Sequence, residues 1–251
     1  MLEIQRHRFS WKIKEIWFAD APRDVSDCDS VMFRSCPQKV DARGFNCEMH
    51  QTLQIDLSQS LPTLWKNVRR DSRRGVENAK KRNVAVLKNQ SYDEFYEMYT
   101  SFRRRKGLGK YWGLDLIKKY GTLFLAVLNG KILCGTLFLE DSLCMRALLS
   151  GTTRFEGDKD YARLVSDAYR LLVWESIEYA AHKGIRTYDI GGYYTGERKD
   201  EELERNNAFK QSFGGKLTTL YDYTKDYDPL LRLARWIYKQ RTTFSTLTKG
   251  E

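Results

Sequence analysis

The order of apolar segments after Asn83 constrains the fold of this chain more than any other feature of its sequence. The segments alternate between the spacing of strands and the spacing of helices. They give a strand, two helices, three strands, a long helix at about residues 161–183, a strand, a short helix and a last strand. Asn129–Gly130 joins two of these strands and predicts a tight hairpin, because both residues tolerate positive φ angles. The sequence therefore predicts an α+β (α/β) fold with a mixed, mostly antiparallel central sheet flanked by helices.

The first 82 residues have a different character. Residues 1–58 contain strand patterns separated by polar turns, which predicts a β-rich segment. A helix should follow, with Ser60 as its N-cap and Pro62 in its first turn. We therefore expect two parts, an N-terminal segment of strands and this basic helix over residues 1–82, and a larger core over residues 83–251.

That expected helix carries most of the positive charge of the chain. Eight basic residues against two acidic ones give it +6 of the net +10. Like charges four residues apart weaken a helix unless something neutralises them, which favours a phosphate-binding role for Arg69, Arg70 and Arg73. A tRNA or an anionic surface would be a suitable partner. The alternative is a solvated face on a helix that packs against the core.

Composition argues against several classes of protein. No apolar run approaches the roughly 20 residues that a membrane-spanning helix needs. The N-terminus also lacks a signal-peptide pattern, so we expect a cytoplasmic protein without a transmembrane segment. The five cysteines and three histidines are scattered and include no C-x-x-C pair, which predicts reduced thiols and no metal site.

Two short motifs near the C-terminus combine aromatic, charged and glycine residues. In FKQSFGG, Phe209 and Phe213 are four residues apart and therefore share one face of a helical turn, which Gly214 and Gly215 end. In YDIGGY, Asp189 lies at the end of a predicted buried strand. Strand ends are where ligands bind in open α/β sheets, so this aspartate is a candidate site residue.

The order of elements resembles the GNAT N-acyltransferase fold. Within that superfamily, YDIGGY, FKQSFGG and a strand ending in Asp-Leu-Ser before an Arg-rich helix are similar to the FemAB-like branch. This branch contains the non-ribosomal aminoacyltransferases that build peptidoglycan cross-bridges. The similarity covers about Thr52 to Asp222.

The resemblance implies a role for the lysine of FKQSFGG. Lys210 would place a positive charge beside the transferred carbonyl or its phosphate-bearing leaving group, and Phe209 would steady it. An amine acceptor attacking that carbonyl produces an oxyanion, which a fixed ammonium stabilises. The alternative is an ordinary surface lysine on an amphipathic helix.

The residues of YDIGGY suggest complementary roles. Asp189 could accept the proton of the amine, or orient Tyr193 or Lys210. Tyr193 is a candidate general acid or stacking platform, and Gly191 and Gly192 would allow a sharp turn and close approach of a substrate. For Asp189 the alternative is a carboxylate that binds the amides of a neighbouring loop.

Thr152 and Arg154 stand where the GNAT fold has its phosphate loop, before the long helix. The positive end of that helix dipole favours anions, so both are candidate phosphate ligands. A plain loop is the alternative. The usual coenzyme A pattern, R/Q-x-x-G-x-G/A, is matched only in part, because Lys159 occupies the place of a small residue.

These features predict an N-acyltransferase that forms an amide on an amine-bearing acceptor. The donor would be an acyl-CoA or an aminoacyl-tRNA, and the lack of a long helical hairpin favours the thioester. A nucleic-acid-binding module that uses the Arg-rich helix is one alternative. A degenerate GNAT-like domain that binds a ligand without catalysis is another.

Overall fold

The hairpin predicted at Asn129–Gly130 is present in the computed structural model of the chain, which describes residues 1–108, 112–196 and 200–237. It joins β6 (Thr122–Leu128) to β7 (Lys131–Glu140). Asn129 and Gly130 have φ angles of 50° and 77°, as a tight hairpin turn requires.

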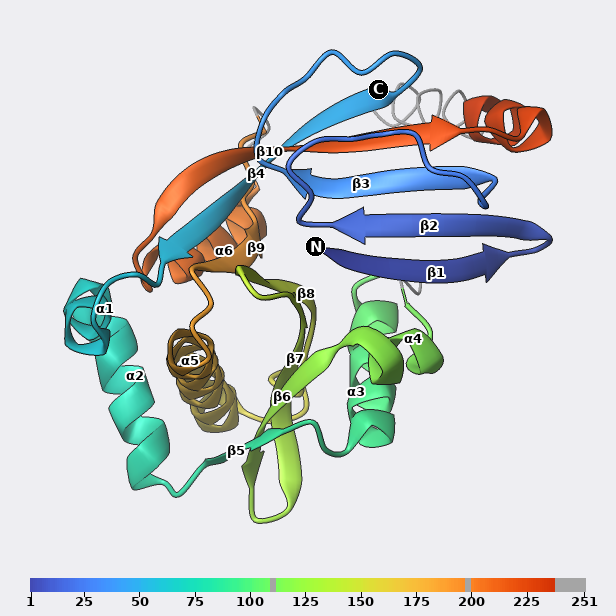
Figure 1. Cartoon of the computed structure of the whole chain (residues 1–251). Helices are drawn as coiled ribbons and strands as arrows, with labels where there is room; N and C mark the ends of the chain where they lie inside the picture. The colour runs from blue at the N-terminus through green and yellow to red at the C-terminus, as the bar shows by residue number, and fades with distance from the viewer. Residues whose placement is uncertain (109–111, 197–199, 238–251) are drawn as a thin grey trace. The chain divides into compact units, whose positions relative to one another are not determined.

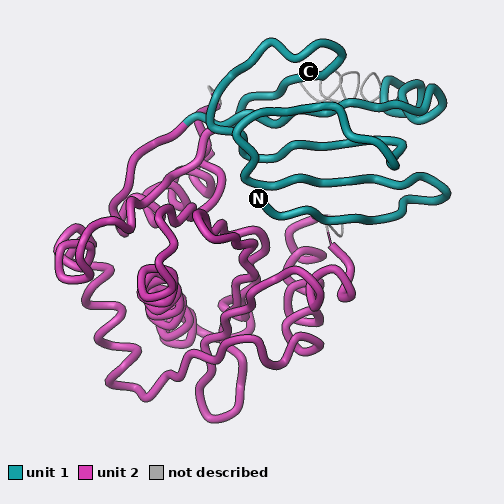
Figure 2. Tube along the Cα trace, viewed as in Figure 1, with its two compact units in different colours: residues 1–50, 219–251 teal, residues 51–218 magenta. Residues whose placement is uncertain are grey.

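Residues 51–218 form one compact unit around a mixed sheet (Figure 2). The strands run in the order β4-β9-β8-β7-β6-β5, and only β8 and β9 pair in parallel. The bounds of the remaining strands are β4 (Asn46–Asp56), β5 (Ala85–Lys88), β8 (Cys144–Thr152) and β9 (Thr187–Gly192). This is the predicted class, a mostly antiparallel sheet with helices on its faces.

Helices cover both faces of this sheet (Figure 1), with α2 and α5 on one side and α3 and α4 on the other. The helices of the unit are α1 (Leu61–Asn67), α2 (Arg70–Lys81), α3 (Tyr92–Arg105), α4 (Leu114–Tyr120), α5 (Lys159–His182) and α6 (Glu201–Gln211). The core lies between α5 and the sheet, where Leu172 and Ile177 are buried with Phe138 and Tyr188. None of the helices within the described residues is long and apolar enough to cross a bilayer.

The single basic helix expected after Ser60 is two helices. Ser60 does cap α1, by accepting a hydrogen bond from the Thr63 amide at 3.4 Å. Val68 and Arg69 are extended, however, and α2 begins at Arg70. The break occurs because the Arg69 amide donates to the carbonyl of Ser212, at 2.8 Å, instead of continuing the helix. The apolar stripe continues across this break, so helical periodicity alone did not reveal it.

Residues 1–50 and 219–237 belong to the other compact unit (Figure 2). Its sheet has the order β1-β2-β3-β10, in which β2 and β3 are parallel and the other pairs antiparallel. The strands are β1 (Leu2–Arg8), β2 (Trp11–Trp17), β3 (Ser30–Cys36) and β10 (Lys216–Asp226). Residues 229–237 are helical. The two units have different bounds from the division at Asn83 that we expected.

Candidate functional site

The sheet of residues 51–218 opens between β8 and β9. These strands pair over three residues only, Cys144–Arg146 with Thr187–Asp189. Beyond them, β8 continues along β7 while β9 continues along β4. The register between β7 and β8 shifts just after this point, and such an irregularity bends a strand. Arg146 and Asp189 therefore mark the place where the two strands diverge.

An ion pair occupies the point of divergence. The Arg146 guanidinium donates to Oδ2 of Asp189, and their side chains are 11% and 1% exposed. The other carboxylate oxygen, Oδ1, accepts hydrogen bonds from the Thr52 hydroxyl and from the Gly191 amide, the latter at 2.8 Å. Both oxygens of Asp189 are thus engaged as acceptors, which suits a role in holding its neighbours more than one in taking a proton from a substrate.

Lys210 reaches this ion pair from α6. Asp200 caps the start of this helix, because its carboxylate accepts from the amides of Glu202 and Leu203. At the tenth residue of α6, the half-buried Lys210 donates from Nζ to the carbonyl oxygen of Gly192. Burial lowers the pKa of Lys210, the charge of Asp189 opposes this effect and the charge of Arg146 adds to it. The ammonium is therefore held at the end of β9 in a partly desolvated place.

Phe209 points to α5 and anchors α6 on it. Its ring centroid lies 5.3 Å from that of Tyr169 and 5.4 Å from that of Phe213. The Arg170 guanidinium lies 5.5 Å from the centroid of Phe209. Because consecutive residues of a helix point in different directions, this packing turns Lys210 toward β9.

The end of β9 and the residue after it are fixed by their backbone conformation and by hydrogen bonds. Gly191 is buried with a φ of 98°, which side-chain-bearing residues rarely adopt. The Tyr193 amide donates to the Gln51 carbonyl at 2.7 Å, and its hydroxyl accepts from Gln211 Nε2 at 2.6 Å. Gly192 is exposed and carries the carbonyl that binds Lys210.

Asn207 is a further part of this arrangement that the sequence did not indicate. Its side-chain amide is buried, accepts from the Tyr194 amide at 3.0 Å and donates to the Tyr194 carbonyl at 2.7 Å. The Asn207 side chain thereby makes both hydrogen bonds that a neighbouring strand would otherwise make with the backbone of Tyr194. Arg146 and Thr52 were also missed. A charged residue within the otherwise apolar strand sequence CMRALLSG was the available signal for Arg146, because buried charges need partners.

The structure does not bring Thr152 and Arg154 to the same place. Thr152 ends β8, about 20 Å along the strand from Arg146 at the usual rise per residue. The Thr152 hydroxyl accepts from the Arg154 amide at 3.2 Å, and the exposed Arg154 guanidinium lies over Phe155. The start of α5 already has a carboxylate at its amides, since Asp158 accepts from the Tyr161 amide at 2.8 Å.

The arginines of α2 differ in what they contact. Arg69 pairs with Asp71 at 2.8 Å. Arg73 donates to the carbonyls of Trp65 and Lys66, at 3.3 and 3.0 Å, and so completes the end of α1. Arg70 is exposed. The start of α2 also docks on the end of α6, because the hydroxyls of Ser72 and Ser212 are 2.6 Å apart.

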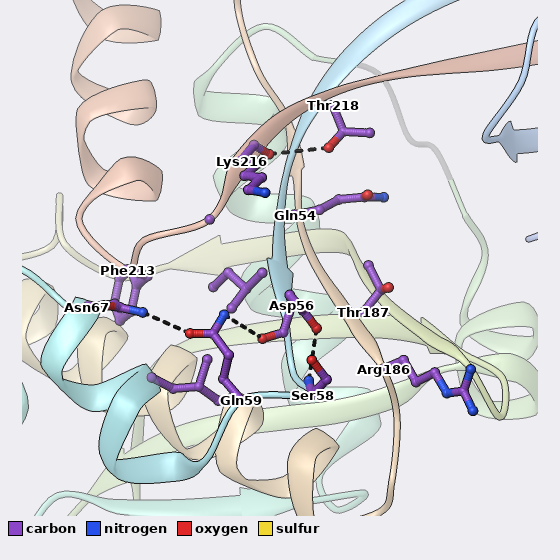
Figure 3. Close-up of a pocket in the computed structure, with 13 residues that line it drawn as sticks. Gln54, Asp56, Ser58, Gln59, Asn67, Arg186, Thr187, Phe213, Lys216 and Thr218 are labelled. Atoms are coloured by element: carbon purple, nitrogen blue, oxygen red, sulfur yellow. Dashed lines mark hydrogen bonds between the residues drawn. The ribbon is translucent and has the colours of Figure 1, made fainter.

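A pocket of about 460 Å³ lies beside the last residues of β4 and the first residue of β9 (Figure 3). Gln54, which is paired with Asp189 across β4 and β9, is one of its lining residues, but Lys210 and Asp189 are not. Ile55, Leu64 and Phe213 supply apolar surface. The polar and charged lining residues are Gln54, Asp56, Ser58, Gln59, Asn67, Arg186, Thr187, Lys216 and Thr218. Among the described residues, no group of His, Cys, Asp and Glu side chains could hold a metal ion.

No protein-family model matches the sequence, and the curated proteins include no match. Solved structures do share its fold. FemX superposes with a TM-score of 0.64 at 14% identity, over 92% of this chain and 85% of FemX. The C-terminal domain of a putative lysylphosphatidylglycerol synthetase from Agrobacterium fabrum gives 0.56 at 11% identity, over 94% of this chain and 83% of that domain. L-PGS from Bacillus licheniformis gives 0.53 at 10% identity, over 83% and 72% of the two chains.

The chain shares the fold of FemX and of these two other structures. In this fold the meander β6–β8, the long helix α5 and strand β9 follow one another in the order that the sequence predicted. At these identities the likeness concerns the fold. What the chain does must therefore be argued from its own side chains.

Proposed function

We propose that this chain is an acyltransferase that moves an acyl or aminoacyl group onto the amine of an acceptor and forms an amide. The observation that carries the proposal is the position of Lys210. Its ammonium is partly desolvated at the Gly192 carbonyl, beside the Arg146–Asp189 pair and where β8 and β9 diverge. A fixed cation in such a place suits the stabilisation of developing negative charge on a carbonyl oxygen.

The reaction needs little more than this charge and correct positioning. The amine nitrogen forms a bond to the carbonyl carbon, and the bond from that carbon to the leaving atom breaks. The leaving atom is the sulfur of a thioester or the ribose oxygen of an aminoacyl-tRNA. The carbonyl oxygen becomes negative in between, and one well-placed donor there is worth roughly 3–4 kcal/mol. Lys210 would exchange the Gly192 carbonyl for this oxygen.

Asp189 and Tyr193 have supporting roles in this proposal. Asp189 would act as a positioning residue, because it fixes Arg146 and the turn at Gly191 and its charge faces Lys210. The Tyr193 hydroxyl, already bonded to Gln211, would give a proton to the leaving atom and regain one from solvent, while the amine loses its proton to solvent. Phe209 would hold α6 so that Lys210 stays aimed at β9.

An aminoacyl-tRNA is the donor that we would test first. The pyrophosphate of a coenzyme A donor would have to bind at the start of α5, where the Asp158 carboxylate already accepts an amide hydrogen bond and repels an anion. Arg69 and Arg70, on the exposed start of α2, offer positive charge for the phosphates of a larger donor. The name of the second solved neighbour, a putative lysylphosphatidylglycerol synthetase, also points to an aminoacyl group.

The acceptor would bind in the pocket beside β9 (Figure 3). The carboxylate of Asp56 gives it an attraction for an ammonium group, and Lys216 gives it one for a carboxylate. An acceptor that carries both charges, such as a short peptide or an amino acid derivative, would suit this lining. Asp56→Asn should then raise KM for the acceptor and leave kcat nearly unchanged.

Transfer from labelled aminoacyl-tRNA and, separately, from labelled acyl-CoA to a panel of amines tests the proposal. We expect Lys210→Met to lower transfer at least about tenfold, since it removes one charged donor. Lys39→Met, at an exposed position of the other unit, is the matched control and should transfer like the wild type. A fully active Lys210→Met protein would overturn the proposal. Salt-sensitive RNA binding without transfer would identify a nucleic-acid-binding module instead, and coenzyme A binding without turnover a non-catalytic domain.

A further inference from the structure

The apolar side of the last described helix faces solvent. Leu230, Leu233, Trp236 and Ile237 are 68%, 53%, 60% and 40% exposed. Leu231 is the residue of this segment that packs inward, and Asp228 caps the helix by accepting from the Leu231 amide at 2.8 Å. Apolar residues at this spacing share one face of a helix, and that face is normally buried. Within the described residues, this face is therefore an exposed apolar stripe.

A second apolar residue of the same unit is exposed at a position that does not favour it. Phe9 lies in the turn between β1 and β2, is 86% exposed and has a φ of 57°. Asn or Gly is the usual residue at such a position, because a bulky side chain makes the left-handed conformation unfavourable. The conformation of Phe9 thus costs stability, and the exposed ring gains little from burial to offset it. Backbone strain that is retained in this way is often associated with function.

Both features lie at the same end of the four-stranded sheet. Arg8 pairs with Trp11 beside the Phe9 turn, and β2 pairs with the start of β3 two residues later, Ile13 with Ser30. Ser30 in turn pairs with Asp226, the last residue of β10, and the helix follows directly. Figure 1 shows the turn between β1 and β2 and the helix after β10 at one end of this unit. We call the Phe9 turn and residues 229–237 the apolar end.

The sequence around the helix is basic. From Pro229 to Glu251 the sequence has five basic residues and one acidic one, within a protein of net charge +10. Arg232 is exposed on the helix, and Arg235 pairs with Asp226 at 2.9 Å. A helix that combines a Leu and Trp face with arginines and no acids is typical of segments that lie in the interface of an anionic bilayer.

We propose that the apolar end binds the surface of a bilayer that contains anionic lipids. Leu230, Leu233 and Trp236 would insert at the level of the headgroups and Phe9 beside them. The basic residues would remain at the phosphates. A bilayer accounts for apolar residues on two separate elements more simply than a partner with one groove, because it offers a continuous surface. The proposal does not depend on the transferase reaction, which concerns residues of the other unit.

Flotation of the full chain with vesicles tests this proposal. We expect binding to vesicles of equal parts phosphatidylcholine and phosphatidylglycerol, and much weaker binding to phosphatidylcholine alone. Leu233→Ser with Trp236→Ser should weaken vesicle binding about tenfold or more, because two buried apolar groups are lost. Leu143→Ser, in the other unit and with Leu143 54% exposed, is the matched control and should bind like the wild type.

Phe9→Asn distinguishes an effect on vesicle binding from an effect on folding. Asparagine tolerates the left-handed conformation, so this variant should be at least as thermally stable as the wild type while binding vesicles several-fold more weakly. Equal binding of wild type, the double variant and Phe9→Asn would overturn the proposal. Failure of the wild type to float with anionic vesicles would overturn it as well. A self-association in solution that Trp236→Ser abolishes, without vesicle binding, would assign the apolar end to a contact between copies of this chain.

Discussion

The carbonyl oxygen of Gln54 lies 2.6 Å from the position that a Cβ on residue 215 would occupy, and residue 215 is a glycine. This glycine follows α6 and has a φ of 100°. The close approach brings the segment after FKQSF against β4, next to the pocket beside β9 (Figure 3). The second glycine of the motif is therefore required by packing as well as by conformation.

Gly215→Ala should be strongly destabilising, because the new methyl group meets backbone atoms that cannot move aside. Gly184→Ala is the matched control, since Gly184 also has a positive φ, of 79°, but nothing within 4 Å of its Cβ position. The control should lose about 1–2 kcal/mol from the unfavourable conformation alone. Urea unfolding should show a clearly larger loss for Gly215→Ala, and equal losses would contradict this account.

Replacing one member of the buried ion pair where β8 and β9 diverge should cost more stability than replacing both members. Asp189→Asn leaves the Arg146 charge without its carboxylate and should lower the free energy of unfolding by roughly 3–5 kcal/mol. Combining it with Arg146→Met removes the unpaired charge, so the double variant should recover part of the lost stability. A double-mutant cycle with no coupling between the two positions would be inconsistent with the ion pair.

The transfer reaction should weaken at alkaline pH as Lys210 loses its proton. Burial lowers the pKa of Lys210 below the ordinary lysine value of 10.5, so the decline should begin at a lower pH than for an exposed lysine. In Lys210→Arg the side chain stays charged, and this alkaline decline should disappear even if kcat is reduced. The same decline in both proteins would exclude Lys210 as its cause.

The free energy of unfolding should rise with pH over the same range in which the transfer rate falls. Because the pKa of Lys210 is lower in the folded chain, the unfolded chain binds more protons between that value and 10.5. The contribution of Lys210 to the free energy of unfolding therefore rises with pH through this window. Lys210→Met should be more stable than the wild type at neutral pH, and urea titrations should show its advantage shrinking as the pH is raised. An advantage that does not change with pH would contradict the assigned cause.

Two arginines of α2 should affect the binding of a phosphate-bearing donor without affecting folding. Arg70 and Arg74 are exposed, whereas Arg73 binds the carbonyls that end α1. Arg70→Gln with Arg74→Gln should weaken tRNA binding and leave the Tm unchanged. The slope of log affinity against log salt concentration should fall by about the amount that two phosphate contacts contribute. Arg73→Gln should lower the Tm in addition. Affinity that is indifferent to Arg70 and Arg74 would mean that this face is merely solvated.

The sequence predicted those parts of the fold whose causes are local. The hairpin at Asn129–Gly130 and the long helix at 159–182 follow from residues close together in the chain. The break at Val68–Arg69 could not be predicted, because its cause is a hydrogen bond to Ser212, far along the sequence. The outward apolar side of residues 229–237 was equally hidden, since periodicity shows that a helix has an apolar side but not which way it faces.

The features of the candidate site also fall into those with local causes and those that depend on residues far apart in the sequence. The packing of Phe209 with Phe213 follows from their spacing, and the left-handed turn at Gly191 from its residue type. The partner of Asp189 depends on the parallel register of β8 and β9, which aligns Arg146 with it across 43 residues. Nothing in the local sequence fixes that register. The roles of Lys210, Asp189 and Tyr193 in catalysis stay predictions until transfer is measured.

The paired hydrogen bonds between Asn207 and the backbone of Tyr194 have a mechanical consequence. They link Tyr194, the second residue after β9, to Asn207 in α6, three residues before Lys210. Any ligand that displaces this helix must therefore carry the tyrosine segment with it, or else break both bonds at once. Admission of a substrate and alignment of the ammonium would then be a single coupled movement rather than two independent adjustments.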